Sequence, residues 1–320
     1  MTSSTTRRLA RRGIRAAFAA ATLAASSATL AVGAASASSD VTPSAAITVP
    51  ANSTGASAVL VASMEGRNEV TAGAPAGQAL ELIGIEGNKL TYSVSWRGLG
   101  TPTGADIHAA ARGVDGPVVI PLFTTPPQTD GFATGTVTVA DPSVLDAMRS
   151  NPAGFYADVH TSGFPNGAAR GQLHQLSHAV STTGVAAQQF SVASGSQIYA
   201  CTPQLDGSFA FTQRDVEAHL IGGIHHTFVQ PVAGPPQWQA PDGSAVSGKV
   251  VTRNSNGAGN IAELDLDATQ IGASTGMLAN AVEVLRLNTV GGVAPTGTCD
   301  PQATPTVAVP YQADYVFING

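Results

Sequence analysis

The stretch ELIGIEGNKLTYSVSW, residues 81–96, decides the fold class. Its second half, KLTYSVSW, alternates apolar residues with hydroxyl-bearing ones, so the apolar side chains fall on one face of an extended strand. The apolar run ELIGI precedes it, and Glu86-Gly87-Asn88 between the two runs is a turn signal. The stretch therefore predicts an antiparallel β-hairpin.

The same pattern of short strands continues on both sides of a single helix. The segments GPVVIPLF (116–123), FATGTVTV (132–139) and FYADVHT (155–161) are short and bounded by Gly or Pro. Two further alternating strands are AVEVLRLNT (281–289) and VPYQADYVFI (309–318). DPSVLDAMRSNP (141–152) predicts a helix, because Asp141 can cap it and Pro142 suits its first turn. Asp-Gly pairs at 206–207 and 242–243 predict further hairpins. We expect an all-β protein of two antiparallel β-sandwich-like domains in tandem, with one short helix in the first.

The first residues have the pattern of a secretory signal peptide. Five arginines precede an Ala-rich run, which ends in the small-residue sequence Ala35-Ser36-Ala37. We expect residues 1–37 to be removed near Ala37 and the mature protein to be secreted without a stable membrane anchor. A linker rich in Ser, Thr, Pro and Ala is expected at 38–57, and a second, weaker junction at 177–190, which leaves domains at 58–176 and 191–320.

The charge balance of the mature chain excludes some classes of partner. Without residues 1–37, the chain has 10 Lys and Arg residues and 21 Asp and Glu residues, which gives a formal charge of −11. An acidic protein of this kind is a poor binder of nucleic acid. We expect the partner to be an extracellular ligand that the sequence does not identify.

The two cysteines predict one disulfide. Cys201 and Cys299 are the only cysteines in the chain, and an even count in an exported protein favours pairing. Two free thiols remain the alternative, whereas a metal site made of cysteines alone would need closely spaced pairs.

Two strands together predict a candidate metal site. In ADIHAAARG (105–113), Asp106 and His108 are two residues apart and share a strand face, and FYADVHT places His160 on one face in the same way. If the two strands are neighbours, these three side chains can converge on one divalent cation, zinc or copper. The alternative is that they are half-exposed polar residues with a structural role.

The first domain resembles a known family. ASMEGRNEV (62–70), YSVSWRGL (92–99), ADIHAAARG and YADVHTSGFPNGAARGQL (156–173) are similar to the CHRD domain, which is found in chordin and in secreted bacterial proteins. The family pattern reads H-I-H where this chain has Asp106-Ile107-His108, and it resembles the H-x-H strand of copper/zinc superoxide dismutases. The substitution weakens redox copper chemistry more than it weakens binding of a divalent metal. Dismutase activity would also need about six ligands, including a bridging His.

Arg170, in the segment AARGQL, matches an arginine near the end of the CHRD pattern. We expect a structural ion pair with Asp158 or Asp106, with contact to a ligand as the alternative.

The second half resembles a secreted domain-of-unknown-function family numbered 3455. The resemblance rests on IYACTP (198–203), GPPQW (234–238), APDGSAVSG (240–248), GGVAPTGTCD (291–300) and VPYQADYVF (309–317). Some members carry a malate dehydrogenase label, but this chain has no G-x-G-x-x-G between a strand and a helix, so the label is rejected here.

The aromatic residues of the second half mark a candidate ligand cleft. The candidate cleft residues are His226, Trp238 and Tyr311, although Trp238 and Tyr311 also suit a core. No catalytic residues are assigned, because GASTG (272–276) is followed by no His that could act as a base. We expect a non-enzymatic extracellular or cell-surface binding protein, with a single-site metal-dependent protein carrying a superoxide-dismutase-like CHRD domain as the alternative.

Overall fold

The hairpin predicted at residues 81–96 is present. Strands β3 (Gln78–Glu86) and β4 (Lys89–Arg97) pair antiparallel over their whole length. Gly87 forms the turn with φ +57°, a left-handed conformation that glycine adopts without steric cost.

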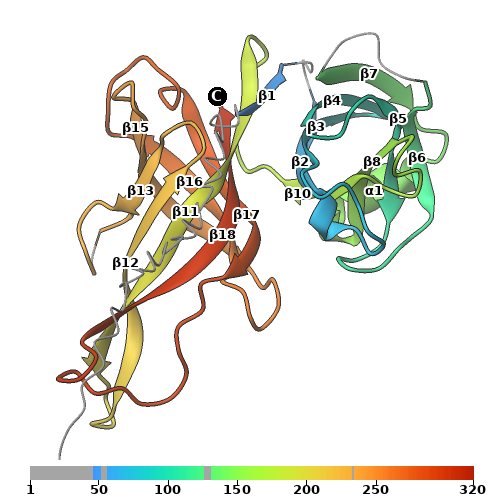
Figure 1. Cartoon of the computed structure of the whole chain (residues 1–320). Coiled ribbons are helices and arrows are strands. Elements are labelled where there is room, and N and C mark those ends of the chain that lie inside the picture. The colour runs from blue at the N-terminus through green and yellow to red at the C-terminus, as the bar shows by residue number, and fades with distance from the viewer. Residues whose placement is uncertain (1–45, 52–55, 126–130, 233) are drawn as a thin grey trace, which may run out of the picture. The chain divides into compact units, whose positions relative to one another are not determined.

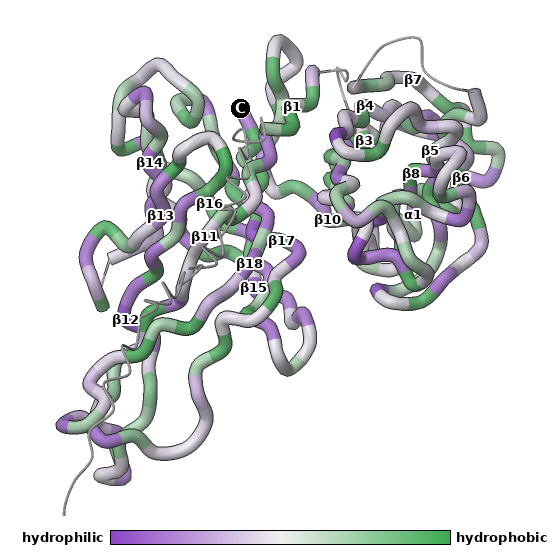
Figure 2. Tube along the Cα trace, in the orientation of Figure 1, coloured by the Kyte–Doolittle hydropathy of each residue, from purple (hydrophilic) through white to green (hydrophobic). Residues whose placement is uncertain are grey.

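The structure is a computed structural model and describes residues 46–51, 56–125, 131–232 and 234–320. Within these ranges the chain consists of antiparallel strands, one α-helix and two short 3₁₀ turns (Figure 1). The all-β class is therefore confirmed. Figure 2 shows hydrophilic and hydrophobic residues intermixed along the strands of both sheets, as expected for strands with one face on a core.

The first sheet has the strand order β6-β5-β8-β9-β2-β3-β4-β7, and the short strand β10 also pairs with β2. Its further elements are β2 (Ala58–Glu65), η1 (Gly66–Asn68), β5 (Pro102–Ala109), β6 (Val118–Phe123), β7 (Phe132–Thr138), α1 (Pro142–Ser150), η2 (Pro152–Gly154), β8 (Phe155–Thr161), β9 (Ala169–Gln172) and β10 (His174–Gln175).

Helix α1 begins as the sequence predicts. The Asp141 side chain accepts a hydrogen bond from the Ser143 backbone N–H at 3.0 Å, and Pro142 is the first helical residue. Leu145 and Met148 are buried and belong to the core of the first sheet. The helix thus covers part of the apolar interior of this sheet.

The second sheet closes on itself. Strand β11 pairs with both β12 and β18, so that β11 to β18 form a ring of antiparallel strands to which β1 is added. Its opposite walls enclose a core as the two layers of a sandwich would. The strands are β1 (Ile47–Pro50), β11 (Val185–Pro203), β12 (Phe209–Leu220), β13 (His225–Phe228), β14 (Pro236–Gln239), β15 (Ala245–Asn254), β16 (Glu263–Gln270), β17 (Ala281–Gly291) and β18 (Thr306–Asn319).

Each sheet has its own apolar core, and a third cluster has residues from both. That cluster includes Val61 and Leu80 of the first sheet and Leu285 and Val316 of the second. The two sheets accordingly belong to one compact unit.

Both segments expected to be linkers contain part of a strand. Ile47–Pro50, inside 38–57, is strand β1, and β11 begins at Val185, inside 177–190. The apolar residues Ile47 and Val49 alternate with polar Thr48 and are buried against the third cluster. The signal peptide predicted at 1–37 lies outside the described residues.

The predicted disulfide is present between Cys201 and Cys299, whose Cα atoms are 5.9 Å apart. It joins strand β11 to the segment between β17 and β18, which contains no strand. The alternative of two free thiols is thereby excluded.

Candidate functional site

Strands β5 and β8 are neighbours and bring the three predicted ligands together. They pair antiparallel with Asp106 opposite Asp158 and Gly104 opposite His160, so His160 lies diagonally across from Asp106. The Asp106 Oδ1 atom is 2.6 Å from His108 Nε2 and 3.2 Å from His160 Nε2. One potential ligand atom from each side chain lies within 4.8 Å of the other two.

The tautomer of His108 follows from its second contact. His108 Nδ1 is 2.8 Å from the Gly116 carbonyl oxygen, and a carbonyl can only accept, so Nδ1 carries the proton. In the neutral ring Nε2 is then a bare acceptor that faces a carboxylate oxygen at 2.6 Å, and this contact is not aligned as a hydrogen bond. Two acceptors this close require a proton or a cation between them, and a backbone carbonyl on the other ring nitrogen is the usual support of a metal-binding His.

Burial and charge act in opposite directions on this group. Burial alone would raise the pKa of Asp106, but its close contacts with the His108 and His160 rings, and their charges, lower it below its ordinary value. Burial alone would lower the pKa of His108, but the close Asp106 carboxylate and the Gly116 carbonyl raise it. The group therefore keeps Asp106 ionised, as a metal ligand must be.

Arg170 supports the site through a stack of side chains. Its guanidinium carbon lies 3.6 Å from the centre of the Tyr156 ring, and this ring stacks on His108 at 4.6 Å between centroids. Arg170 is 2% exposed and its ion pair is with Asp115, at 3.2 Å. The expected partners were Asp158 and Asp106, but Asp115 is the one that forms a direct ion pair.

The carboxyl of Asp158 lies on the same sheet face but is not in the ligand group. It is 3% exposed, and its pKa is raised by burial and by the charges of Glu69 and Asp106. Sequence reasoning did not mark Glu69, because nothing in the spacing of 62–70 shows that it packs beside β8. A protonated Asp158 leaves Asp106 as the anion of this face.

A second group of three potential ligands lies on the second sheet. His225 Nε2 is 2.6 Å from Glu217 Oε1, and His219 Nε2 is 3.8 Å from the same oxygen. This group is largely exposed, with the Glu217 side chain at 56%, and an exposed cluster is held less firmly than the Asp106 group.

The candidate cleft residues separate into two that line a cavity and one that does not. His226 and Trp238 stack at 4.5 Å between ring centroids and line a cavity of about 80 Å³ within the second sheet. Tyr311 is buried but does not line the cavity. Its hydroxyl is 3.1 Å from that of Tyr315, which does line it. Tyr311 thus contacts the cavity wall from behind.

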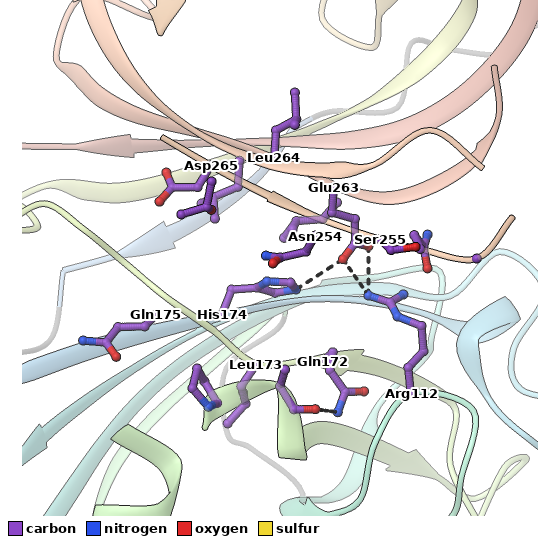
Figure 3. A pocket seen from close by; sticks show the side chains of 17 residues that line it. Arg112, Gln172, Leu173, His174, Gln175, Asn254, Ser255, Glu263, Leu264 and Asp265 are labelled. Atoms are coloured by element: carbon purple, nitrogen blue, oxygen red, sulfur yellow. Dashed lines mark hydrogen bonds and ion pairs between the residues drawn. The ribbon is translucent and has the colours of Figure 1, made fainter. Parts of the chain in front are cut away.

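A cavity of about 590 Å³ was not predicted from the sequence (Figure 3). Arg112 forms an ion pair with Glu263 at 2.8 Å, and His174 Nε2 lies 3.9 Å from the same carboxylate. Burial, together with the charge of Arg112, lowers the pKa of His174 to about 4. Because 151 residues separate Arg112 from Glu263, no local pattern could reveal this pair.

Among the described residues, no helix is both long enough and apolar enough to cross a membrane.

Comparison with known families agrees with the division of the chain. Residues 60–173 match the CHRD domain, and residues 212–319 match a family described as protein of unknown function (DUF3455). No curated protein and no solved structure matches the chain. The two predicted resemblances are therefore confirmed.

Proposed function

We propose that this chain, which combines a CHRD domain with a DUF3455 domain, is an extracellular binding protein. Its CHRD domain holds one divalent cation at Asp106, His108 and His160. The observation that carries the proposal is the convergence of these side chains from two neighbouring strands, with one carboxylate oxygen within 3.2 Å of both imidazoles. Export is supported by the arginine-led apolar segment before Ala37 and by the disulfide.

The donor set favours zinc over a redox metal. One carboxylate and two imidazoles are a common zinc set that leaves a fourth position for water or a ligand. Each of the two ligand groups in the described residues offers three side chains, fewer than a copper–zinc pair needs. The cation would order the β5–β8 face and supply a coordination point for a partner, which is a binding role.

We expect the full mature chain, expressed without a histidine tag and purified without chelator, to carry about one zinc per chain. The measurement is elemental analysis, followed by titration of the chelator-stripped protein with zinc and with copper. Loss of one of three ligands in His160→Ala or His108→Ala should weaken zinc binding by more than the roughly 10–100-fold that loss of an outer-shell partner costs. The reason is that two remaining ligands cannot hold the ion in place.

His225→Ala is the matched control, because it removes a histidine from the exposed group beside Glu217. It should leave the zinc content and affinity unchanged. Zinc that disappears with His225→Ala and remains with His160→Ala would contradict the proposal, and so would wild-type protein without stoichiometric metal.

A further inference from the structure

The closed second sheet contains a cavity of about 80 Å³ between its walls. Arg253, Leu264, Arg286 and Tyr315 form one row across β15, β16, β17 and β18, each opposite the next, and all four line the cavity. An eight-stranded closed sheet is wide enough to hold one small ligand. The row supplies a wall with charged, apolar and aromatic members.

Three aromatic rings form another part of the wall. His226 lies parallel to Trp238 and edge-on to Tyr315 at 5.0 Å, and Trp238 is 5.4 Å from Tyr315. Rings in mutual contact are fixed in position, so the groups they carry toward the cavity are preorganised.

Two buried N–H donors of this wall have no partner among the described residues. Trp238 Nε1 and Gln197 Nε2 make no hydrogen bond, and each side chain belongs to a residue that is only 1% exposed. The other end of the Gln197 amide is occupied, because its Oε1 accepts from Gln213 Nε2 at 2.6 Å. A buried donor without an acceptor costs free energy, which a ligand with acceptor atoms would recover.

The charge at the cavity is positive. Two arginines line it and no Asp or Glu does, in a chain with an excess of acidic residues. Arg286 is 9% exposed, and its Nε and one terminal nitrogen donate to the Ala262 carbonyl oxygen. In the part of the chain that the structure describes, Arg286 forms no ion pair.

His226 contributes no charge of its own. Its Nδ1 donates to the Gln237 carbonyl at 2.8 Å, and burial, reinforced by the charge of Arg286, lowers its pKa to about 3. The positive charge that faces the cavity is therefore that of the arginines.

We propose that this cavity binds a small organic carboxylate, with Arg286, Trp238 and Gln197 as its donors. A carboxylate offers acceptors only and is charged, which matches unpaired donors beside a buried cation. A cavity of roughly 150 Å³ holds benzene, so about 80 Å³ suits an acid of two to four carbons whose alkyl group contacts the aromatic rings. The site is independent of the metal group, whose ligands come from β5 and β8 of the first sheet.

Propionate is the probe, and Trp238 is the reporter. The chain has two tryptophans, so Trp96→Phe leaves Trp238 as the only one and its fluorescence reports on the cavity. In this folded variant we expect a saturable change with propionate at constant ionic strength. Propionamide, which has the same shape without the charge, and added sodium chloride should give no saturable change.

Three further variants, made in the Trp96→Phe background, locate the site. Arg286→Gln should weaken propionate binding about tenfold to a hundredfold, since it removes a charged donor. Gln197→Glu should weaken it at least as much, because it keeps an acceptor for Gln213 but puts a carboxylate oxygen, which repels the ligand, in place of the unpaired donor. Arg253→Gln, which removes an exposed charge at the cavity edge, should change affinity by about threefold or less.

These results have clear opposites. The proposal would be overturned if propionate gave no saturable response or if propionamide gave an equal one. It would also be overturned if Arg253→Gln and Arg286→Gln lost equal amounts of affinity for propionate. Circular dichroism verifies that each variant is folded, and the propionate–propionamide comparison needs no substitution at the site. His160→Ala should bind propionate normally, which separates this test from that of the metal centre.

Discussion

Replacing both Cys201 and Cys299 by serine is expected to lower the free energy of unfolding by about 4 kcal/mol. The bond joins residues 98 positions apart, and closing a loop of this length removes much conformational freedom from the unfolded chain. It also fixes the segment after β17, where Cys299 N–H donates to the Phe209 carbonyl at 3.0 Å. Without the bond, this segment is held by weaker contacts.

Urea unfolding followed by circular dichroism measures the effect. Wild-type protein with a reductant should coincide with the double variant in oxidising buffer, because both lack the bond. The zinc content should stay the same, since the ligand strands lie in the first sheet. If reduced wild-type protein, with both thiols titratable, unfolds at the same urea concentration as oxidised wild type, then the disulfide contributes nothing to stability.

Local patterns of the sequence predicted most of the secondary structure. The hairpin turn at Gly87, the cap at Asp141 and the alternating strand at 281–289 all follow from residues that are neighbours in the chain. The pairing of β5 with β8 was an assumption, and the structure provides it. The sequence signal for this site was that two separated strands each carried polar residues at every second position.

What the sequence could not predict depends on distant partners. Closure of the second sheet requires β11 to pair with β18, more than 100 residues away. The cavity lined by Arg286, Trp238 and Gln197 depends on that closure. Of these three residues, only Trp238 was predicted from the sequence, with His226, to belong to a ligand cleft. The ion pair of Arg170 with Asp115 depends on a loop conformation that no pattern shows.

Glu81 is a further case in which only tertiary structure reveals the chemistry, and it gives the second large effect. This residue lies on β3 between Ala62 of β2 and Val94 of β4, and its side chain is 1% exposed. Its Oε1 atom has no hydrogen-bond partner in the described part of the chain. Burial, with a contribution from the charge of Asp106, raises the pKa of Glu81 from 4.5 to about 8.

The direction of the pH dependence follows from proton binding. Between about pH 4.5 and pH 8 the folded state keeps a proton on Glu81 that the unfolded state releases, so this residue lowers stability as pH rises. The slope from one such group is at most about 1.4 kcal/mol per pH unit. Glu81→Gln cannot ionise, so its free energy of unfolding should exceed that of wild type by an amount that grows from pH 5 to pH 8 and then levels off.

Urea unfolding at pH 5, 6, 7, 8 and 9 tests this, with the difference between the two proteins as the measured quantity. The other buried carboxyls, such as Glu65 and Asp158, are present in both proteins and cancel in the difference. Glu86→Gln is the matched control, because Glu86 lies on the same strand with an exposed side chain, and its curve should run parallel to that of wild type. If the Glu81→Gln difference is flat across this range, then water or a partner reaches the carboxylate in the folded state, and the interior of the first sheet is more polar than its burial indicates.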